Sequence, residues 1–440
     1  MKILFISLGC DKNLADSEEM LGLLTAGGHE ITDDETQADA IVINTCCFIK
    51  DAKEESVETI LEMAEYKKTG SCHALIVTGC MAQRYQKEII EEVPEVDAVL
   101  GTTSYGDIVK ALEEAVAGNH FEEFRDIDYL PDTGSKRVLT TGGHFGYLEI
   151  AEGCDKHCTY CIIPKLRGKF RSVPMERLIA QAEDMAEQGV KELILVAQET
   201  TVYGKDLYGK KSLHILLKKL CEIRGIRWIR ILYCYPEEIY DELIETIRDE
   251  KKICHYLDIP IQHASDRILK RMGRRTSKQE LIDIVGKLRK EIPDIVLRTT
   301  LITGFPGETE EDHEELKEFV DEMEFERLGV FTYSPEEDTP AATMPDQIDE
   351  EVKEDRQADI MELQQEIVFD QAEDMIGKEV LVMIEGKVAD ENAYVGRTYR
   401  DAPNVDGLIF VNTDEELMTG DFAKVKVTGA AEYDLIGELI

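Results

Sequence analysis

Short β-rich runs alternate with helical patterns along most of the chain, and this alternation limits the possible folds more than any other feature. Between residues 1 and 118 the β-rich runs lie at 2–7, 40–44, 74–78 and 98–100. Runs of this kind, separated by helices, are typical of a parallel sheet with helices on its faces. We therefore predict an amino-terminal α/β domain at 1–118, with ligands at the carboxyl ends of its strands.

A second alternating series begins after residues 119–139, which lack periodicity and which we interpret as a linker. Its six β-rich runs lie at 146–151, 192–197, 228–233, 256–259, 295–302 and 328–333. Helical patterns such as 175–188 and 310–322 separate these runs. Six βα units predict a partial or complete parallel (β/α) barrel at 140–370, whose chemistry belongs at the strand carboxyl ends.

The carboxy-terminal part of the chain has a different pattern. A charged helical stretch at 350–374 precedes alternating runs at 379–384 and 423–427, and Gly, Asn and Asp punctuate these runs. This pattern predicts a small antiparallel β-barrel at 373–440. The fold class is therefore α/β in the first two domains, with a small all-β domain at the end.

Charge and cysteine content narrow the possible functions. The 440 residues carry a formal net charge of −41, which disfavours a nucleic-acid partner and favours a basic protein, although solubility alone would also explain it. Every apolar run is short, including the opening one, so we expect a cytoplasmic protein that does not bind membranes. Eleven cysteines are too sparse for a disulfide scaffold and suit metal ligation in a reducing compartment.

Cys154, Cys158 and Cys161 form the most specific motif, in the loop after the first strand of the predicted barrel. Thiolates bind iron–sulfur clusters, and a 4Fe–4S cluster needs four ligands. Three protein ligands leave one iron open, and the amino and carboxylate groups of S-adenosylmethionine (SAM) could bind it. A structural zinc site with His157 as fourth ligand is the alternative, but no second C-x-x-C pair lies downstream to complete it.

Three further cysteines, Cys10, Cys46 and Cys80, each follow a predicted strand of the amino-terminal domain. A lone cysteine after a strand is more often a small buried hydrophobic residue than a ligand. Here the common placement brings all three to one edge of the sheet. A glycine precedes both Cys10 and Cys80 and allows the backbone to approach a bulky cluster.

The central motif, C-x3-C-x2-C with Tyr160 before its last cysteine, resembles the radical SAM signature. Together with the amino-terminal cysteines, it makes the whole chain similar to the methylthiotransferase family. The resemblance implies that Cys154, Cys158 and Cys161 hold the cluster that cleaves SAM, and that Tyr160 packs near the adenine.

The same resemblance implies a second 4Fe–4S cluster held by Cys10, Cys46 and Cys80, and a TRAM-like carboxy-terminal barrel. Cys47 does not match a ligand position of the family and is an adjacent alternative. The remaining cysteines are expected to be structural: Cys72, Cys221, Cys234 and Cys254.

Three segments, 7–18, 152–155 and 197–206, resemble the RimO branch of the family, which modifies an aspartate of small-subunit ribosomal protein S-twelve. The third segment departs from the pattern, because Glu199 stands where this branch generally has Asp; this leaves the role of the carboxylate open. Residues 376–440 contain thirteen Asp and Glu against six Lys and Arg. An acidic barrel suits a basic ribosomal protein better than it suits tRNA.

Polar or glycine-rich groups follow the remaining barrel strands, where SAM and substrate should lie. Resemblance to radical SAM barrels implies SAM contacts for Gln198, Gln262 and Gly304, although an interior polar group or a simple turn would explain the last two. Arg298 must pair with a carboxylate or bind an acid such as the carboxylate of SAM. A basic run after the cluster loop is either a solvated face or a site for an acidic substrate side chain: Lys165, Arg167, Lys169 and Arg171.

These observations lead to one hypothesis for function. We expect a methylthiotransferase that consumes two SAM per turnover, one as methyl donor and one as radical source. Its product would be a methylthio group on the β-carbon of an aspartate in ribosomal protein S-twelve, free or within the small subunit. An electron-donor protein is an expected partner. The alternatives are a tRNA adenosine methylthiotransferase, a non-catalytic iron–sulfur carrier and a zinc-dependent binding module.

Overall fold

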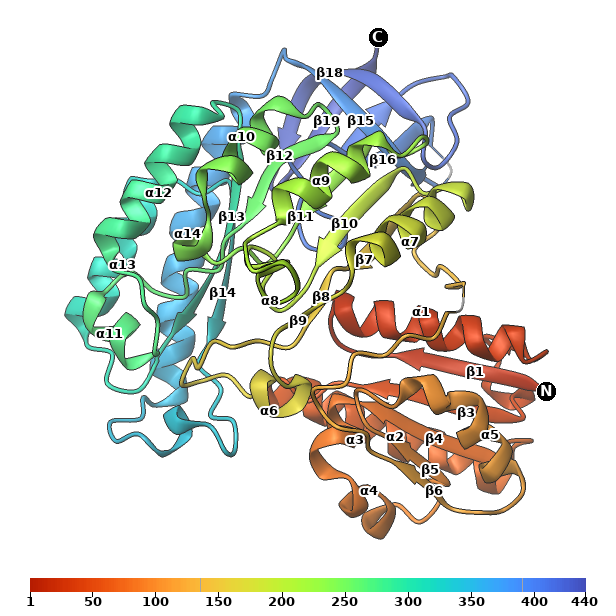
Figure 1. Ribbon diagram of the computed structural model, residues 1–440. Helices are drawn as coiled ribbons and strands as arrows, with labels where there is room; N and C mark the ends of the chain where they lie inside the picture. The colour runs from red at the N-terminus through yellow and green to blue at the C-terminus, as the bar shows by residue number, and fades with distance from the viewer. Residues whose placement is uncertain (135, 390) are drawn as a thin grey trace.

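The computed structural model describes residues 1–440 except 135 and 390. Three units follow one another along the chain: an α/β domain, a larger parallel sheet covered by helices, and a small closed β-barrel (Figure 1). Among the described residues, no helix is both long and apolar enough to cross a bilayer.

The amino-terminal domain is a parallel sheet with the strand order β2-β1-β3-β4-β5-β6. Its strands are β1 Lys2–Ser7, β2 Glu30–Thr32, β3 Ala40–Thr45, β4 Ala74–Gly79, β5 Ala98–Leu100 and β6 Phe121–Glu123. Its helices are α1 Asp11–Ala26, α2 Lys50–Thr69, α3 Cys80–Tyr85, α4 Lys87–Glu92 and α5 Ile108–Val116. Successive strand residues point to opposite faces, so Ile41 and Ile43 pack against α2 while Val42 packs on the side of α1 and α5.

All four strands predicted for this domain are present, and β1 and β5 have the predicted bounds. Strands β2 and β6 are not predicted from the sequence; they have three residues each and are largely exposed or half-buried. Segments this short contain too few buried positions to show alternation. Because β6 pairs with β5, the sheet continues past the predicted boundary at 118 into the segment interpreted as a linker.

The central sheet has six parallel strands in the order β14-β13-β12-β11-β10-β7 and does not close, so it is a partial barrel. Its strands are β7 Phe145–Glu149, β10 Glu192–Val196, β11 Trp228–Ile231, β12 Ile253–Asp258, β13 Val296–Thr303 and β14 Arg327–Thr332. The helices of this unit are α6 Ile163–Arg167, α7 Met175–Glu187, α8 Lys205–Tyr208, α9 Leu213–Glu222, α10 Asp241–Asp249, α11 Asp266–Arg271, α12 Lys278–Glu291, α13 Glu310–Met323 and α14 Glu350–Glu373.

The two faces of the central sheet have different partners. Residues such as Leu193 and Leu297 join the large core beneath the outer helices. The opposite face contributes Tyr147 and Tyr256 to a second cluster, which also includes Leu14 from α1 and residues of the carboxy-terminal barrel. The central sheet is therefore the unit that both other domains contact.

The carboxy-terminal barrel closes in the order β15-β16-β17-β19-β18. Its strands are β15 Glu379–Lys387, β16 Ala393–Arg397, β17 Ile409–Asn412, β18 Phe422–Ala431 and β19 Asp434–Leu439. The prediction of a small, mainly antiparallel β-barrel is confirmed: four of its five neighbouring pairs are antiparallel, and β17 and β19 pair in parallel. A closed ring of five strands cannot alternate direction at every step, because five is odd; at least one neighbouring pair must run in parallel.

Candidate iron–sulfur sites

Cys10, Cys46 and Cys80 lie at the carboxyl ends of three neighbouring strands, β1, β3 and β4. The register aligns the strand ends, because Ser7 is opposite Asn44 and Asn44 is opposite Thr78. Cys46 and Cys80 are buried, whereas Cys10 is exposed at the start of α1. The structure thus brings together the three cysteines that the sequence analysis grouped.

Two glycines let the cysteine loops approach each other closely. Gly9 has φ +91°, and a Cβ atom there would lie 2.7 Å from the Cβ of Cys46. Gly79 has φ +92°, and a Cβ atom there would lie 2.3 Å from Oδ1 of Asn44. Any larger residue would collide with these neighbours, so both positions require glycine.

The environment of these thiols suits metal ligation. Burial, and then the charge of Cys80, raises the pKa of Cys46 to about 12. A buried thiolate without a positive partner is therefore unfavourable at neutral pH. A bound metal removes this penalty, because the ligating form of cysteine is the thiolate. The three free thiols fit a cluster that needs three protein ligands.

Asn13 connects the three amino-terminal cysteine loops. Its Nδ2 donates to the carbonyl oxygens of Leu8 at 2.9 Å and Thr45 at 3.0 Å. Its Oδ1 lies 4.0 Å from Sγ of Cys80 and also accepts a hydrogen bond from Arg167. One amide therefore fixes the approach of all three loops and links them to the central domain.

Cys154, Cys158 and Cys161 lie in the loop between two short paired strands, β8 Ala151–Glu152 and β9 Arg171–Ser172. The loop is tightly turned, since the amide of Cys161 donates to the carbonyl of Cys158 at 3.1 Å. The amide of Lys156 donates to Sγ of Cys154 at 3.4 Å.

Cys154 and Cys158 are buried and Cys161 is half-buried. Burial, above all, raises the pKa of both Cys154 and Cys161 to about 12, and the charges of the neighbouring thiols add to the effect. His157 is exposed, unlike Cys154 and Cys158. These observations fit a cluster with three thiolate ligands better than a zinc site that uses His157.

The residues predicted to contact SAM differ in how many of their polar side-chain atoms already have a hydrogen-bond partner. Nε2 of Gln198 donates to Glu152 at 3.3 Å, but its Oε1 is buried without a partner among the described residues. The Oε1 of Gln262 is unpartnered in the same sense, and the residue adopts φ +73°. Tyr160 is half-buried, with its ring 6.4 Å from that of Phe305. The Oε1 atoms of Gln198 and Gln262, unpartnered among the described residues, can therefore accept hydrogen bonds from a ligand.

Arg298 and Gly304 have structural partners of their own. Nη1 of Arg298 donates to Asp258 at 2.9 Å, and its Nε lies 3.5 Å from Asp406 of the carboxy-terminal barrel. Gly304 has φ +67°, and a Cβ atom there would lie 2.2 Å from Cγ of Lys353. The expected carboxylate partner of Arg298 is thus present, and the positive φ together with the close packing of Lys353 accounts for the glycine.

Two of the four residues in the basic run after the cluster loop, Lys169 and Arg167, differ in burial. Lys169 is exposed, as expected of a solvated face. Arg167 is 2% exposed and binds internal carboxylates: its Nη1 lies 2.7 Å from Asp16 and 3.3 Å from Glu152. Arg167 is therefore neither on a solvated face nor free to hold an acidic substrate side chain, and for this residue both alternatives are wrong.

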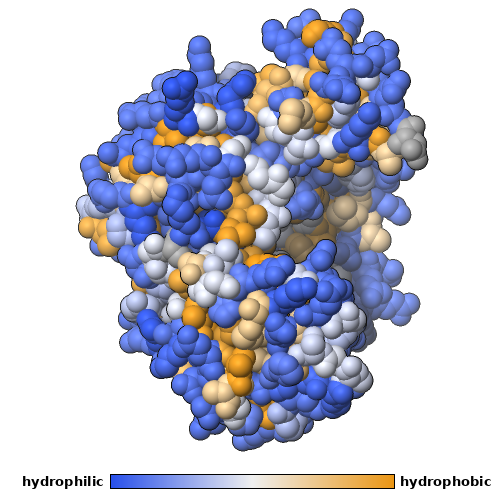
Figure 2. Space-filling view, turned by 90° about the vertical axis from the view of Figure 1, so that its right-hand side faces the viewer, coloured by the Kyte–Doolittle hydropathy of each residue, from blue (hydrophilic) through white to orange (hydrophobic). Residues whose placement is uncertain are grey.

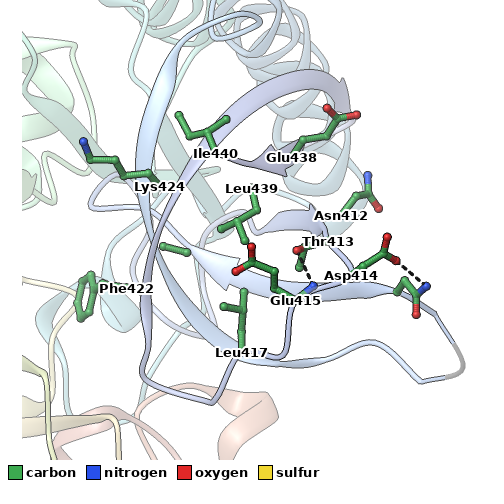
Figure 3. A pocket seen from close by; sticks show the side chains of 12 residues that line it. Asn412, Thr413, Asp414, Glu415, Leu417, Phe422, Lys424, Glu438, Leu439 and Ile440 are labelled. Atoms are coloured by element: carbon green, nitrogen blue, oxygen red, sulfur yellow. Dashed lines mark hydrogen bonds between the residues drawn. The ribbon is translucent and has the colours of Figure 1, made fainter.

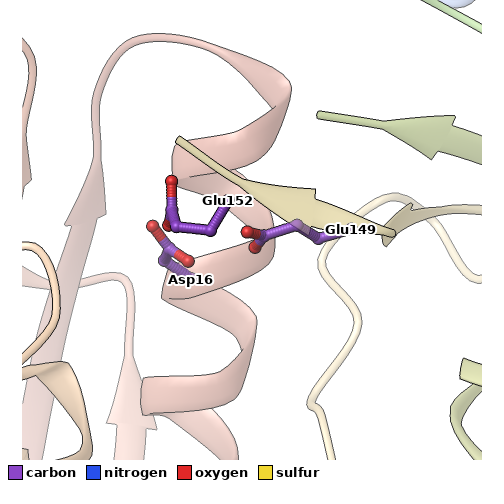
Figure 4. A group of neighbouring side chains, drawn as sticks. All are labelled: Asp16, Glu149 and Glu152. Atoms are coloured by element: carbon purple, nitrogen blue, oxygen red, sulfur yellow. The ribbon is translucent and has the colours of Figure 1, made fainter. Parts of the chain in front are cut away.

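Three carboxylates converge between α1 and the strands β7 and β8: Asp16, Glu149 and Glu152 (Figure 4). Lys12 lies among them, with its Nζ 3.3 Å from Asp16, 3.0 Å from Glu149 and 2.6 Å from Glu152. Since Lys12 and Arg167 already neutralise this group, it is an ion-pair network rather than a vacant metal site.

Glu199 lies close to the central cysteines, and burial and a neighbouring lysine have opposite effects on the pKa of its carboxyl group. Burial raises its pKa to about 7, while Lys156, 3.9 Å away, acts in the opposite direction. The same Lys156 binds Glu238 more closely, at 2.7 Å. The acidic group at position 199 therefore lies near its protonation midpoint at neutral pH.

Four polar residues of these sites are not predicted from the sequence pattern: Lys12, Asn13, Glu152 and Lys156. The available signal was their location, because all four lie inside or beside the cysteine segments that carry the family resemblance. A polar residue one helical turn after a cysteine, such as Asn13 after Cys10, can point back to the loop that carries the cysteine. Their burial could not be read from the sequence, since charged residues are usually exposed.

A surface pocket of about 710 Å³ lies in the carboxy-terminal barrel and contains no predicted site residue (Figure 3). Its lining includes Asp414, Glu415 and Glu438 against a single lysine, Lys424. The pocket therefore has an acidic wall, in keeping with the acidic composition of this barrel.

Comparisons with known proteins cover the three units in turn. Residues 2–101 match the uncharacterized protein family UPF0004, residues 148–320 match the radical SAM superfamily, and residues 376–440 match the TRAM domain. The structure also resembles the radical SAM methyltransferase TsrM from Kitasatospora setae, with a TM-score of 0.55 and 13% identity over 88% of this chain and 79% of that one. At this identity the likeness concerns the fold alone.

Full-length relatives are much closer in sequence. The chain is 67% identical to the ribosomal protein uS12 methylthiotransferase RimO of Lachnoclostridium phytofermentans, over 99% of both chains. It is 52% identical to the RimO of Acetivibrio thermocellus, over 100% of this chain and 98% of that protein. This chain therefore belongs to the RimO family of radical SAM methylthiotransferases.

Proposed function

We propose that this protein adds a methylthio group to the β-carbon of an aspartate in ribosomal protein uS12, the small-subunit protein S-twelve. The observation that carries the proposal is the full-length identity of 67% to a RimO protein, in a chain whose fold groups two separate cysteine triplets. The substrate aspartate would lose one hydrogen atom and gain a carbon–sulfur bond. One SAM would end as methionine and 5′-deoxyadenosine, and the other as S-adenosylhomocysteine.

Each triplet would hold one 4Fe–4S cluster: Cys154, Cys158 and Cys161 in the central domain, and Cys10, Cys46 and Cys80 in the amino-terminal domain. The two clusters, when bound, would supply the electron that cleaves SAM and an iron site for the sulfur that becomes methylated. The chain's own residues would bind and orient the reactants.

Polar groups near the central triplet would hold SAM. The Oε1 atoms of Gln198 and Gln262, which have no partner in the described part of the chain, would accept hydrogen bonds from it. Tyr160, half-buried beside the cysteines, offers an aromatic surface for the adenine. Arg298 would orient Asp258 and the carboxy-terminal barrel rather than bind SAM directly, since both of its carboxylate contacts are already made.

Charge supports a basic protein as substrate. The carboxy-terminal barrel has more than twice as many acidic as basic residues, and its pocket has an acidic wall. Figure 2 shows a mainly hydrophilic face with a band of hydrophobic residues, hollowed between the part that contains this barrel and the part that contains the amino-terminal domain. The acidic barrel would attract a basic ribosomal protein and repel tRNA. We further propose that the protein acts in the cytoplasm and receives electrons from a donor protein.

The test is a substrate comparison. The protein would be reconstituted anaerobically with iron and sulfide and incubated with SAM, a reductant and either uS12 or tRNA. A methylthio mass gain on an aspartate-containing peptide of uS12 is the expected result. The same gain on tRNA alone would overturn the substrate, and 5′-deoxyadenosine without S-adenosylhomocysteine would overturn the methylthio chemistry.

A further inference from the structure

Arg274 is a buried cation beside the central cysteine triplet. It follows α11 in a tight turn that presses against the cysteine loop: the amide of Thr159 donates to the carbonyl of Met272 at 2.8 Å. Gly273 adopts φ +75°, and a Cβ atom there would lie 2.9 Å from the carbonyl oxygen of His157. The turn thus fixes Arg274 relative to the loop that carries Cys154, Cys158 and Cys161.

The guanidinium of Arg274 uses only part of its hydrogen-bonding capacity. Nη2 donates to the carbonyl of Pro260 at 2.9 Å, and the group lies 4.4 Å from the centre of the Tyr235 ring. The Oη of Tyr235 is in turn 3.7 Å from Sγ of Cys158. Although Arg274 is only 7% exposed, its Nε and Nη1 have no partner within the described part of the chain.

Two other cations near the cysteines, the half-buried Lys156 and the buried Arg167, are paired with carboxylates, whereas Arg274 forms no ion pair within the described part of the chain. Lys156 binds Glu238 at 2.7 Å, and Arg167 binds Asp16 at 2.7 Å. Glu237 is the carboxylate with the strongest electrostatic effect on Arg274, and it already lies 3.7 Å from Lys156. Burying a cation with two unpaired hydrogen-bond donors destabilises the folded protein unless an anion lies beside it. Cys158 is among the groups that act electrostatically on Arg274, and its sulfur would carry negative charge when it binds a metal.

We propose that Arg274 is a positioning residue for the cluster at Cys154, Cys158 and Cys161, and that its guanidinium balances the negative charge there. The inference rests on the proposed function, since it needs that cluster. Reduction by one electron from a low-potential donor adds one negative charge at this site and neither makes nor breaks a bond. A fixed buried cation, with donors available to sulfur, favours the reduced state.

The test is a redox titration followed by electron paramagnetic resonance. It uses the full-length chain with Cys10, Cys46 and Cys80 replaced by alanine, so that only the central cluster titrates. Arg274→Met is expected to lower the ratio of reduced to oxidised cluster about tenfold at the wild-type midpoint, which corresponds to about 59 mV. Arg274→Lys keeps the charge and is expected to stay within about threefold of the parent ratio.

Arg275→Met is the matched control, because it removes the same charge from the next residue, which is exposed. It should titrate like the parent. If Arg274→Met does not fold or load iron, Arg274→Gln replaces it in the titration. A fully loaded Arg274→Met or Arg274→Gln protein with the parent midpoint would overturn the inference. So would an unchanged midpoint together with SAM binding weakened tenfold, since Arg274 would then serve SAM instead. A parent chain that binds no iron would instead refute the proposed cluster.

Discussion

The Nη1 atom of Arg167 lies 2.7 Å from Oδ2 of Asp16, a residue 151 positions earlier in the chain. The contact joins the loop of the central cysteine triplet to the helix that begins after Cys10. Glu152 binds both Arg167 and Lys12, so the network extends across the boundary between the two domains. The two cysteine sites are therefore held in relation to each other by buried charges.

Removal of the Arg167 charge should weaken this connection. Arg167→Met leaves Asp16 and Glu152 with Lys12 as their remaining cation, and breaking one side of a buried ion pair typically costs about 3–5 kcal/mol. Urea unfolding of the apoprotein would measure the loss, and iron analysis would show reduced loading, because Arg167 also binds Asn13. Lys169→Met, at an exposed position two residues away, is the control and should change neither value. Equal stability of the Arg167→Met protein and the wild type would contradict this account of the network.

Glu149 makes stability depend on pH. Burial, opposed by Lys12, raises the pKa of its carboxyl to about 8 in the folded protein, from 4.5. Between these values the folded state holds a proton that the unfolded state has lost, so stability decreases as pH rises. From pH 6 to 8 this group should cost about 2 kcal/mol.

A variant that cannot ionise provides the check. Glu149→Gln resembles the protonated carboxyl, so its unfolding free energy should fall less than that of the wild type between pH 6 and 8. Glu222→Gln, at an exposed position, should follow the wild-type curve. Parallel curves for the wild type and Glu149→Gln would mean that Glu149 is ionised in the folded protein throughout this range.

The two triplets should have separable activities. Cys158→Ala is expected to abolish formation of 5′-deoxyadenosine and of the methylthio product. Cys46→Ala should still cleave SAM but give no methylthio product, because only the amino-terminal site is lost. Each variant should bind about half the wild-type iron. Chromatography with mass detection would follow both products, with Cys221→Ala as the control; production of methylthiolated uS12 by Cys46→Ala would refute the assignment.

Glu192 should hold the carboxy-terminal barrel against the central sheet. Its carboxylate lies 2.7 Å from Nε of Arg230 and 2.8 Å from Nη2 of Arg397, and all three side chains are buried. Glu192→Gln would leave two buried guanidinium groups without their shared anion, at a cost of about 3–5 kcal/mol. Limited proteolysis would report earlier release of the barrel at residues 374–378. Glu438→Gln, within the barrel but away from this interface, should be cleaved like the wild type.

The sequence was sufficient for the features that depend on local pattern. Strands β1 and β5 follow directly from short apolar runs. The central cysteine candidates follow from their C-x3-C-x2-C spacing, and Cys10, Cys46 and Cys80 from their common place after strands together with the family resemblance. It was not sufficient for β2 and β6, which have too few residues to show a period. The burial of Arg167 was also beyond it, because four alternating basic residues look alike until the fold selects one. Arg274 gave no signal for the same reason, since its exposed neighbour Arg275 has the same chemistry.

The bond between Arg167 and Asn13 also bears on the order in which the protein matures. Asn13 is synthesised early and ties together the loops of Cys10, Cys46 and Cys80, yet one of its partners is made more than 150 residues later. A nascent chain that has completed only its first domain lacks the cation beneath those loops. Stable iron loading at the amino-terminal site is therefore expected only after translation has passed residue 167.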